Sequence, residues 1–579
     1  MGLLFPLLAA SFIAVGVWLL YDALVRGSKG WVLPLPPGPR GSLVIGNWQL
    51  LRGGKLDELF MQWGGEYESD VVHTRVLGQH VICLNSAQAA TDLIDKRSLN
   101  YGDRPRFRLF EVMGWAPTLT FLSSSSPQFK LHRSLFQTSF SNASIRSYQP
   151  IQMDEAKQAV KGVIERPGEW EDVTLEMSTG IIWRVAFGKG FRSLGGSGEY
   201  KRGGNGPGSS LELGQQEGGN RFLQLAKQAA EATTTGGFPG LNLVDLVPGI
   251  QCLPDAIARR LVPELAHARQ SRHVIENMTN EPWQAARCEM EKQETNKGNG
   301  TTTTTTTTMT TKNSFVGRLY SRMIVESESG GGGDSKKVDA GRNPVARAML
   351  TEGELKGAAA AVLVAGGSTT WSTVCACFLF LTLFPDVQDK IQKELDACLH
   401  QGGRPRLPTF DDLPRLPYLC GFVHEVLRLL PLNPVIIPHA NTAGDEYKGY
   451  RIPARSIILV NAKAINLDPS TYSNPHLFEP ERFMSTKDGG REEPPPLGNF
   501  GFGRRKCPGR ELALQGVRVC LAVMLGVLDV KGDHTRPNKV DVCLGLGGHP
   551  GPFQAHLSVR RPDMAELLLD DLDRQHTNS

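Results

Sequence analysis

One cysteine of this chain lies in a loop of glycines and cations that runs directly into a helix. The stretch GNFGFGRRKCPGRELAL, residues 498 to 514, holds Cys507 with no second Cys or His close by. A structural zinc site or a disulfide would need such a partner. A helix N-terminus and neighbouring cations favour the thiolate form of a cysteine. The loop therefore fits a single thiolate ligand to a metal; a structural cysteine in a glycine-rich turn is the alternative.

The residues around Cys507 indicate what the thiolate would face. Gly503 and Gly509 let backbone N–H groups approach the sulfur, and Phe500 is placed to shield one side. Arg505 is suited to pair with a carboxylate of the group opposite the thiolate. Together these residues predict an axial metal site beneath a planar, acidic cofactor.

The N-terminus carries an apolar run of 19 uncharged residues, Leu3 to Tyr21. A helix of that length is roughly 28 Å long, close to the thickness of a bilayer core. A cleaved signal peptide is the alternative, but it would show cations before the run and a small-residue cleavage site after it. Because the first cations follow the run, we expect a single-pass anchor over residues 1–22 with the rest of the chain cytosolic. Residues 23–41, basic and proline-rich, are expected to form a stiff hinge.

Composition limits the partners and the redox state. A net charge of +4 spread over 579 residues indicates no nucleic-acid partner, which would require a concentrated basic surface. The 10 cysteines are scattered along the chain, as is typical of reduced thiols in the cytosol.

We expect one large domain over residues 42–563, mainly α-helical with small β-sheets. Two stretches within it, about 192–220 and 293–345, are rich in Gly, Ser or Thr and are expected to be disordered insertions. The last residues, 564–579, are expected to form a polar tail.

The spacing Phe500-x-x-Gly503-x-Arg505-x-Cys507-x-Gly509 resembles the haem-binding loop of the cytochrome P450 family. The resemblance covers about residues 34 to 560, apart from the two insertions. It implies the cytochrome P450 fold and one haem b. It also implies that Cys507 is the thiolate ligand of the haem iron and that Arg505 pairs with a haem propionate.

A second motif lies in the apolar stretch HEVLRLL, in which Glu425 and Arg428 are three residues apart. Residues at that spacing share a helix face, and a buried ion pair needs further partners. The stretch FEPERF offers Arg482 as one. The resemblance implies a Glu–Arg–Arg network with a structural role, not a catalytic one.

A long helix is expected from about Glu352 to Leu383. It lies largely within an uncharged run, residues 357–385, so a second membrane span is an alternative. The polar patch GGSTT at residues 366–370 argues against that alternative. Two glycines cost a helix roughly 1 kcal/mol each relative to alanine, which favours local opening beside a ligand.

This patch resembles the distal helix of cytochromes P450. Ala365, Gly366 and Thr369 match the family pattern, which implies a groove for O2 and a Thr369 hydroxyl that helps to deliver protons. Ser368 stands where the family usually has an acid. A hydroxyl relays a proton but does not supply one from a carboxyl group, so this difference puts the efficiency of oxygen activation in question.

Further positions concern the haem propionates. The family usually shows Trp-x-x-x-Arg, and the matching residues here are Phe129 and Arg133. The indole N–H donor is lost, Arg133 remains, and Lys130 or His132 are candidate replacements. His439 stands where the family has Arg or His toward the other propionate; a core histidine is the alternative.

The resemblance implies a monooxygenase that inserts one oxygen atom of O2 into a lipophilic small molecule. Electrons would come from NADPH through the membrane-bound NADPH–cytochrome P450 reductase. Candidate docking residues for this partner are Arg504, Lys506, Arg510 and Lys130. Candidate substrate-pocket segments are residues 107–121, Val364, Ala365, Thr369, Val435 to Ile437, and Leu544 to Gly548.

The combination of an apolar N-terminal run, a proline-rich hinge and these motifs is similar to microsomal fungal cytochromes P450 of secondary metabolism. This resemblance implies an endoplasmic reticulum membrane protein. Two alternatives stay open. One is a peroxide isomerase or dehydratase of the same fold that needs no external electrons. The other is a haem-binding protein without turnover.

Overall fold

The computed structural model describes residues 33–42, 45–51, 54–115, 118–188, 218–235, 238–298, 314–320, 351–400, 405–532, 540, 542–543 and 547–577. The expected anchor over residues 1–22 and most of the expected hinge lie outside these residues. As the sequence predicted, the described chain is mainly helical with small β-sheets.

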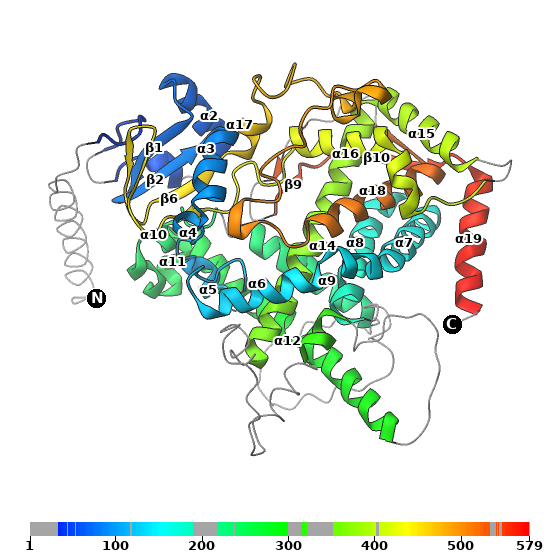
Figure 1. Cartoon of the computed structure of the whole chain (residues 1–579). Coiled ribbons are helices and arrows are strands. Elements are labelled where there is room, and N and C mark those ends of the chain that lie inside the picture. Colours follow the sequence, from blue (N-terminus) through cyan, green and yellow to red (C-terminus); the bar gives the residue numbers. More distant parts are fainter. Residues whose placement is uncertain are drawn as a thin grey trace, which may run out of the picture.

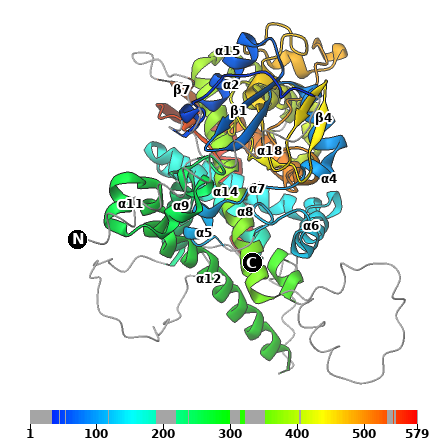
Figure 2. The same cartoon turned by 90° about the vertical axis from the view of Figure 1, so that its left-hand side faces the viewer.

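The body of the molecule is built from long helices that pack side by side (Figures 1 and 2). The helices are α2 (Leu56–Glu66), α3 (Ala87–Ala90), α4 (Ser98–Tyr101), α5 (Arg108–Val112), α6 (Pro127–Ser139), α7 (Asn142–Glu165), α8 (Trp170–Phe187), α9 (Gly218–Thr235), α10 (Leu243–Leu246), α11 (Asp255–Leu261), α12 (Pro263–Gly298), α14 (Glu352–Leu383), α15 (Pro385–Leu399), α16 (Pro417–Leu429), α17 (Ala462–Asn466), α18 (Arg510–Val527) and α19 (Pro562–Thr577).

Helix α14 runs through the centre of the body (Figure 1). It begins at a capping box, in which the Thr351 hydroxyl accepts from the Glu354 N–H and the Glu354 carboxylate accepts from the Thr351 N–H. It ends at Phe384, just before the proline that starts α15. Among the described residues α14 is the one helix long and apolar enough to cross a membrane. Most of it is buried against α8, α12, α16 and α18, so it is the core helix of this domain and not a second span.

The strands form small sheets at the edges of the helical body. The largest has the order β1–β2–β6–β3, with β2 and β6 parallel and the other pairs antiparallel. The strands are β1 (Val71–Val76), β2 (Gln79–Leu84), β3 (His439–Ala440), β4 (Asp445–Tyr447), β5 (Tyr450–Ile452), β6 (Ile457–Val460), β7 (Leu528–Gly532), β8 (Val542–Cys543), β9 (His549–Pro550) and β10 (Ala555–Val559).

A short antiparallel hairpin spans residues 445–452. Its strands are β4 and β5, joined at Lys448 and Gly449, whose φ angles of 51° and 77° suit a tight hairpin turn. Strand β6 leaves the hairpin and pairs with β2 because all four of its residues are buried, which an exposed hairpin strand would not allow.

Parts of the two stretches expected to be disordered are helical in the described residues. Residues 314–320, inside the second expected insertion, form a helical turn in which Phe315 is fully buried. Its ring lies 5.2 Å from that of Phe136. The expected insertions also overlap helices at their edges, since α9 begins at Gly218 and α12 continues to Gly298.

The expected polar tail is helix α19, which packs against α7 and α18. Met564, Leu568 and Leu572 recur on one face of this helix and are buried there. An ion pair of 2.6 Å between Lys157 and Asp571 adds to the contact with α7. The apolar stripe explains the order, because it buries enough surface to offset the cost of fixing the chain.

Candidate functional site

A cavity of about 320 Å³ lies between α14 and the loop that precedes α18. Of the predicted site residues, those that line it are Ala365, Gly366, Thr369, Phe500, Arg505, Cys507, Gly509, Arg133 and His439. Those that do not line it are Ser368, Gly503, Lys130, Glu425, Arg428 and Arg482. Residues far apart in the sequence therefore meet around one space, with the thiol on one wall and the distal patch on another.

Cys507 is exposed to the cavity, although the surrounding protein encloses it. Its amide donates to the Phe500 carbonyl at 2.7 Å, which closes the loop around the sulfur. Burial raises the pKa of the thiol, while the Gly509 N–H and the cations Arg133 and Arg510 oppose that rise. A bound metal cation would complete the stabilisation of the thiolate. Among the described residues no cluster of three or more His, Cys, Asp or Glu side chains is suited to hold a metal, so Cys507 would act as a single protein ligand.

The loop glycines serve different purposes. Gly509 faces the cavity, and a Cβ there would lie 3.9 Å from the Cys507 sulfur. Gly503 points elsewhere: its φ is 54°, and a Cβ would lie 2.4 Å from the carbonyl oxygen of Ile94. Its N–H donates to the Asp95 carboxylate. Gly503 therefore locks the loop against the segment around Ile94 and does not contact the cavity.

Arg505 is held by backbone carbonyls as well as by the cavity wall. Its guanidinium donates to the carbonyls of Gly102, Leu119 and Leu122 at 2.9, 2.8 and 2.6 Å. Its guanidinium carbon lies 4.1 Å from the centroid of the Phe129 ring. Burial lowers the pKa of Arg505 to about 10. The predicted propionate partner thus also ties the segment between α4 and α6 to the Cys507 loop.

The candidates on α6 divide between the two sides of the helix. Arg133 lines the cavity and donates to the Lys506 carbonyl at 2.5 Å. Lys130 is exposed and lies away from the cavity. His132 is buried, but it does not line the cavity either. Arg133 is therefore the α6 cation available to an acidic group in this space.

His439 is buried at one end of the cavity. Its Nδ1 lies 2.9 Å from the carbonyl oxygen of Tyr101, so Nδ1 carries a proton and donates. Its Nε2 is buried without a hydrogen-bond partner among the described residues. Burial and the neighbouring Arg104 lower the pKa of His439 well below the usual range.

Arg104 shares this end of the cavity and was not anticipated from the sequence. Its Nη1 donates to the carbonyls of Ile437 and Pro438 at 2.5 and 2.7 Å. Burial and the nearby Arg505 lower its pKa. Arg104, Arg133 and Arg505 make this end of the cavity cationic, which suits carboxylates, and the neutral His439 lies among them.

On the opposite wall α14 remains helical through the polar patch. The Thr369 hydroxyl donates to the Ala365 carbonyl at 2.6 Å, and the Ser368 hydroxyl donates to the Val364 carbonyl at 2.7 Å. Ser368 lies outside the cavity lining, whereas Thr369 faces it. Gly366 allows α8 to approach, because a Cβ there would lie 2.7 Å from Cδ1 of Ile182.

Glu425, Arg428 and Arg482 meet in the core behind the Cys507 loop. Their side chains are fully buried, and Glu425 accepts from Arg428 at 2.7 Å and from Arg482 at 3.0 Å. The Glu479 N–H also donates to this carboxylate, at 2.9 Å. This is the network expected from the two motifs.

The expected pocket segments reach the cavity only in part. From residues 107–121 the cavity is lined by Leu119 and Thr120, and from Val435 to Ile437 by Ile436 and Ile437. Val364 does not line it, and residues 544–546 lie outside the described part of the chain. Asn433, Ile181 and Ile182 line it without having been anticipated. No local pattern marks them, because the tertiary fold alone brings their segments together.

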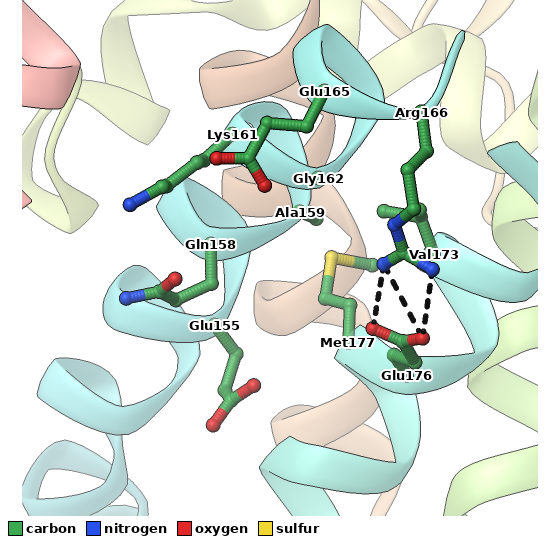
Figure 3. Close-up of a pocket in the computed structure, with 10 residues that line it drawn as sticks. All are labelled: Glu155, Gln158, Ala159, Lys161, Gly162, Glu165, Arg166, Val173, Glu176 and Met177. Carbon is green, nitrogen blue, oxygen red and sulfur yellow. Dashed lines mark hydrogen bonds and ion pairs between the residues drawn. The ribbon is translucent and has the colours of Figure 1, made fainter. Parts of the chain in front are cut away.

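A second, smaller cavity of about 180 Å³ lies between α7 and α8 (Figure 3). Its walls carry charges of both signs, and Arg166 and Glu176 pair across it at 3.1 Å. It contains neither the thiol nor the distal patch, so the larger cavity is the candidate active site.

Comparisons with known proteins agree with this site. The family model described as cytochrome P450 matches residues 36–317 and 335–557. A cytochrome P450 monooxygenase of Armillaria gallica is 30% identical over 97% of this chain and 99% of its own length. A tryptamine 4-monooxygenase of Psilocybe cyanescens is 28% identical over 92% of this chain and 94% of its own. A zebra fish cytochrome P450 solved with abiraterone shares the fold, with a TM-score of 0.61 at 20% identity over 87% of this chain and 100% of that one. This chain therefore belongs to the cytochrome P450 family of monooxygenases, which are oxidoreductases.

Proposed function

We propose that this protein is a haem-thiolate monooxygenase that inserts one oxygen atom of O2 into a neutral, lipophilic small molecule. The observation that carries the proposal is the placement of Cys507 and Thr369 on two walls of one cavity. The Cys507 thiolate is suited to bind iron, and the Thr369 hydroxyl is suited to transfer a proton.

The residues around the cavity fit haem b. Cys507 would be the thiolate ligand of the iron, and Arg104, Arg133 and Arg505, with His439 beside them, would hold the two propionates. The partnerless Nε of Arg104 supports this, because buried polar atoms rarely remain unsatisfied. Nε2 of His439 would donate to a propionate only after the ring binds a second proton, which a nearby negative charge favours. Apolar walls such as Ile436, Ile437 and Leu427 would cover the flat macrocycle.

When bound, the haem supplies the activation of O2, and its thiolate ligand favours O–O cleavage. The chain's own part is to position groups and exclude water. Arg133, Arg510 and the Gly509 N–H stabilise negative charge at Sγ of Cys507. The Thr369 Oγ1 holds a proton at the distal wall while bonded to the Ala365 carbonyl. Neither Ser368 nor Thr369 can supply a proton from a carboxyl group, so delivery to this wall relies on relay.

We propose NADPH–cytochrome P450 reductase as the electron donor, docked on the face beneath Cys507. Lys506 and Lys130 are exposed there and suit an acidic partner. Arg510 is partly engaged, since it pairs with Glu511 at 2.5 Å, and Arg504 lines the cavity. The apolar run at residues 3–21 supports a single-pass anchor in the endoplasmic reticulum membrane, with this domain in the cytosol. Fungal relatives support a role in secondary metabolism.

The absence of an acid at Ser368 favours one second candidate, a peroxide isomerase or dehydratase that needs no external electrons. The experiment that separates the two compares product formation by the purified protein with and without NADPH and reductase, using a panel of neutral lipophilic compounds. Oxygenated product that requires NADPH and reductase supports the monooxygenase. Product without either supports the second candidate, and haem uptake with no product and no substrate-dependent NADPH oxidation indicates a protein without turnover.

Ser368→Asp provides an internal comparison in the same assay. A monooxygenase limited by proton supply should form more product per NADPH consumed when a carboxyl group is introduced next to Thr369. An isomerase or dehydratase should gain nothing from that change.

A further inference from the structure

Three elements converge on the distal side of the cavity. The hydroxyl of Ser368 and the methyl of Thr369 lie against Gly547, where a Cβ would meet them at 3.8 and 3.6 Å. The Gly547 N–H donates to Oδ1 of Asn433 at 3.1 Å. Asn433 therefore sits beside the distal patch of α14, held by the loop that contains Gly547.

This hydrogen bond fixes which way the Asn433 amide faces. Because Oδ1 accepts from Gly547, the other end of the amide is the NH2 group. Nδ2 donates no hydrogen bond within the described part of the chain, and Asn433 is only partly buried and lines the cavity. The Asn433 NH2 group therefore offers two N–H donors to a ligand on the distal side of the cavity.

Two threonine hydroxyls on this wall already donate hydrogen bonds within α14. Thr369 donates to the Ala365 carbonyl at 2.6 Å, and Thr373 donates to the Thr369 carbonyl at 2.8 Å. The remaining nearby wall is largely apolar, with Leu432, Ile436 and Ile437 next to Asn433 in the chain. A ligand here meets an apolar surface interrupted by an amide donor.

The charges around the cavity exclude one class of ligand. None of the described residues that line it is Asp or Glu, and its charged groups are arginines at the cationic end. An ammonium group would be desolvated without an anionic partner, which is unfavourable. A neutral oxygen acceptor would instead satisfy the Asn433 donors.

We propose that Asn433 is a specificity-determining residue that donates a hydrogen bond to a carbonyl, ether or hydroxyl oxygen of a neutral, otherwise apolar substrate. This inference rests on the proposed function and names the substrate class of the same site. A substrate oxygen bound to Asn433 would be held beside Ser368 and Thr369, so it also sets which part of the molecule approaches the reacting centre.

The test uses three imidazole probes that all anchor through the haem iron of the holoenzyme. N-Phenacylimidazole carries a carbonyl, N-phenethylimidazole carries a methylene in its place, and the third probe carries a CH–ammonium there. Dissociation constants are measured at neutral pH from the shift of the Soret band. The wild type should bind the ketone roughly two- to tenfold more tightly than the methylene probe, and the ammonium probe most weakly.

Two variants separate the effect of the Asn433 NH2 donor from that of the hydrogen bond between Asn433 and Gly547. Asn433→Leu removes both, and the ketone preference should fall to a ratio near one. Asn433→Asp keeps an acceptor for the Gly547 N–H but removes the NH2 donors. It should abolish the ketone preference and tighten binding of the ammonium probe.

A ketone preference that is absent in the wild type, or that survives in both variants, would overturn the inference, as would tightest wild-type binding of the ammonium probe. The absence of a thiolate-type Soret band in the reduced carbonyl complex would instead overturn the proposed function. The two failures are therefore distinguishable, because the band is recorded before any probe is added.

Discussion

The guanidinium of Arg505 stacks on the ring of Phe129, with 4.1 Å between its central carbon and the ring centroid. Phe129 of α6 therefore has a structural role although it lacks the indole N–H of a tryptophan. It supports the cation that ties the Cys507 loop to the segment between α4 and α6.

We expect Phe129→Leu to destabilise the protein by about 1–3 kcal/mol, since it removes a cation–π contact and some buried volume. Urea unfolding of the single variants and of the double variant with Arg505→Lys measures the coupling between the two residues. Phe136→Leu, on the same helix, is the control and should be additive with Arg505→Lys. If the changes in unfolding free energy for Phe129→Leu and Arg505→Lys were also additive, the stack would not stabilise the protein.

The two glycines of the α14 patch should respond oppositely to alanine. A Cβ at Gly366 would lie 2.7 and 2.9 Å from two atoms of the stiff Ile182 side chain, and such overpacking costs about 1–3 kcal/mol. A Cβ at Gly367 would meet no atom closer than Thr179 Oγ1 at 3.9 Å, so that variant should gain up to ~1 kcal/mol in helix propensity. Thermal unfolding measures both changes. Equal effects would show that α8 and α14 are not packed as described.

Glu425→Ala should cost about 3–5 kcal/mol or prevent folding, because Arg428 and Arg482 would be left buried with their shared carboxylate missing. Glu511→Ala, which breaks the half-exposed pair with Arg510, should cost about 0–1 kcal/mol. The urea concentration at the unfolding midpoint and the yield of haem-containing protein measure the loss of stability in each variant. Comparable losses for the two variants would argue that the buried network is not a structural element.

Acid should destabilise the protein through histidines that are neutral in the native state, such as the partly buried His549. Burial lowers the pKa of His549, which bonds to Ser372 and stacks on Trp371, to about 4. The unfolded chain binds the proton near pH 6.5 and the native state only near pH 4, so stability is complete above pH 6.5 and is lost as pH falls through this window. At pH 5 the loss from this one group is about 2 kcal/mol.

His549→Gln should therefore lose less stability than the wild type between pH 7 and pH 5, by about 2 kcal/mol in urea unfolding. The exposed His556 provides the matched control, and His556→Gln should follow the wild-type curve. Parallel curves of unfolding free energy against pH for the wild type and His549→Gln would contradict the assignment of a neutral, partly buried imidazole.

Motif spacing predicted those parts of the site whose geometry is local. Cys507 with its glycines, and Glu425 with Arg428, sit in short segments whose backbone determines where the side chains point. Arg104 and Asn433 were missed because their roles depend on contacts with segments more than 100 residues away in the sequence, at Ile437 and Gly547. Gly503 was assigned to the cavity, yet it packs on Ile94, a contact that loop spacing does not reveal.

Composition predicted disorder or a polar tail in two segments where a few apolar residues are embedded in polar sequence. The α19 stripe of Met564, Leu568 and Leu572 is separated by acidic residues, and Phe315 follows a run of threonines. In both cases a few buried side chains outweigh the polar average, because each docks into a preformed apolar surface.

The absorption spectrum of the reduced carbonyl complex tests the central claim most directly, because its Soret position reports a thiolate opposite carbon monoxide. The wild type should show the thiolate-type band, and Cys507→Ser should lose it, while Cys252→Ser, which removes an exposed thiol, should keep it. A wild-type protein that binds haem without this band, or a Cys507→Ser variant that retains it, would contradict the assignment of Cys507 as the haem ligand.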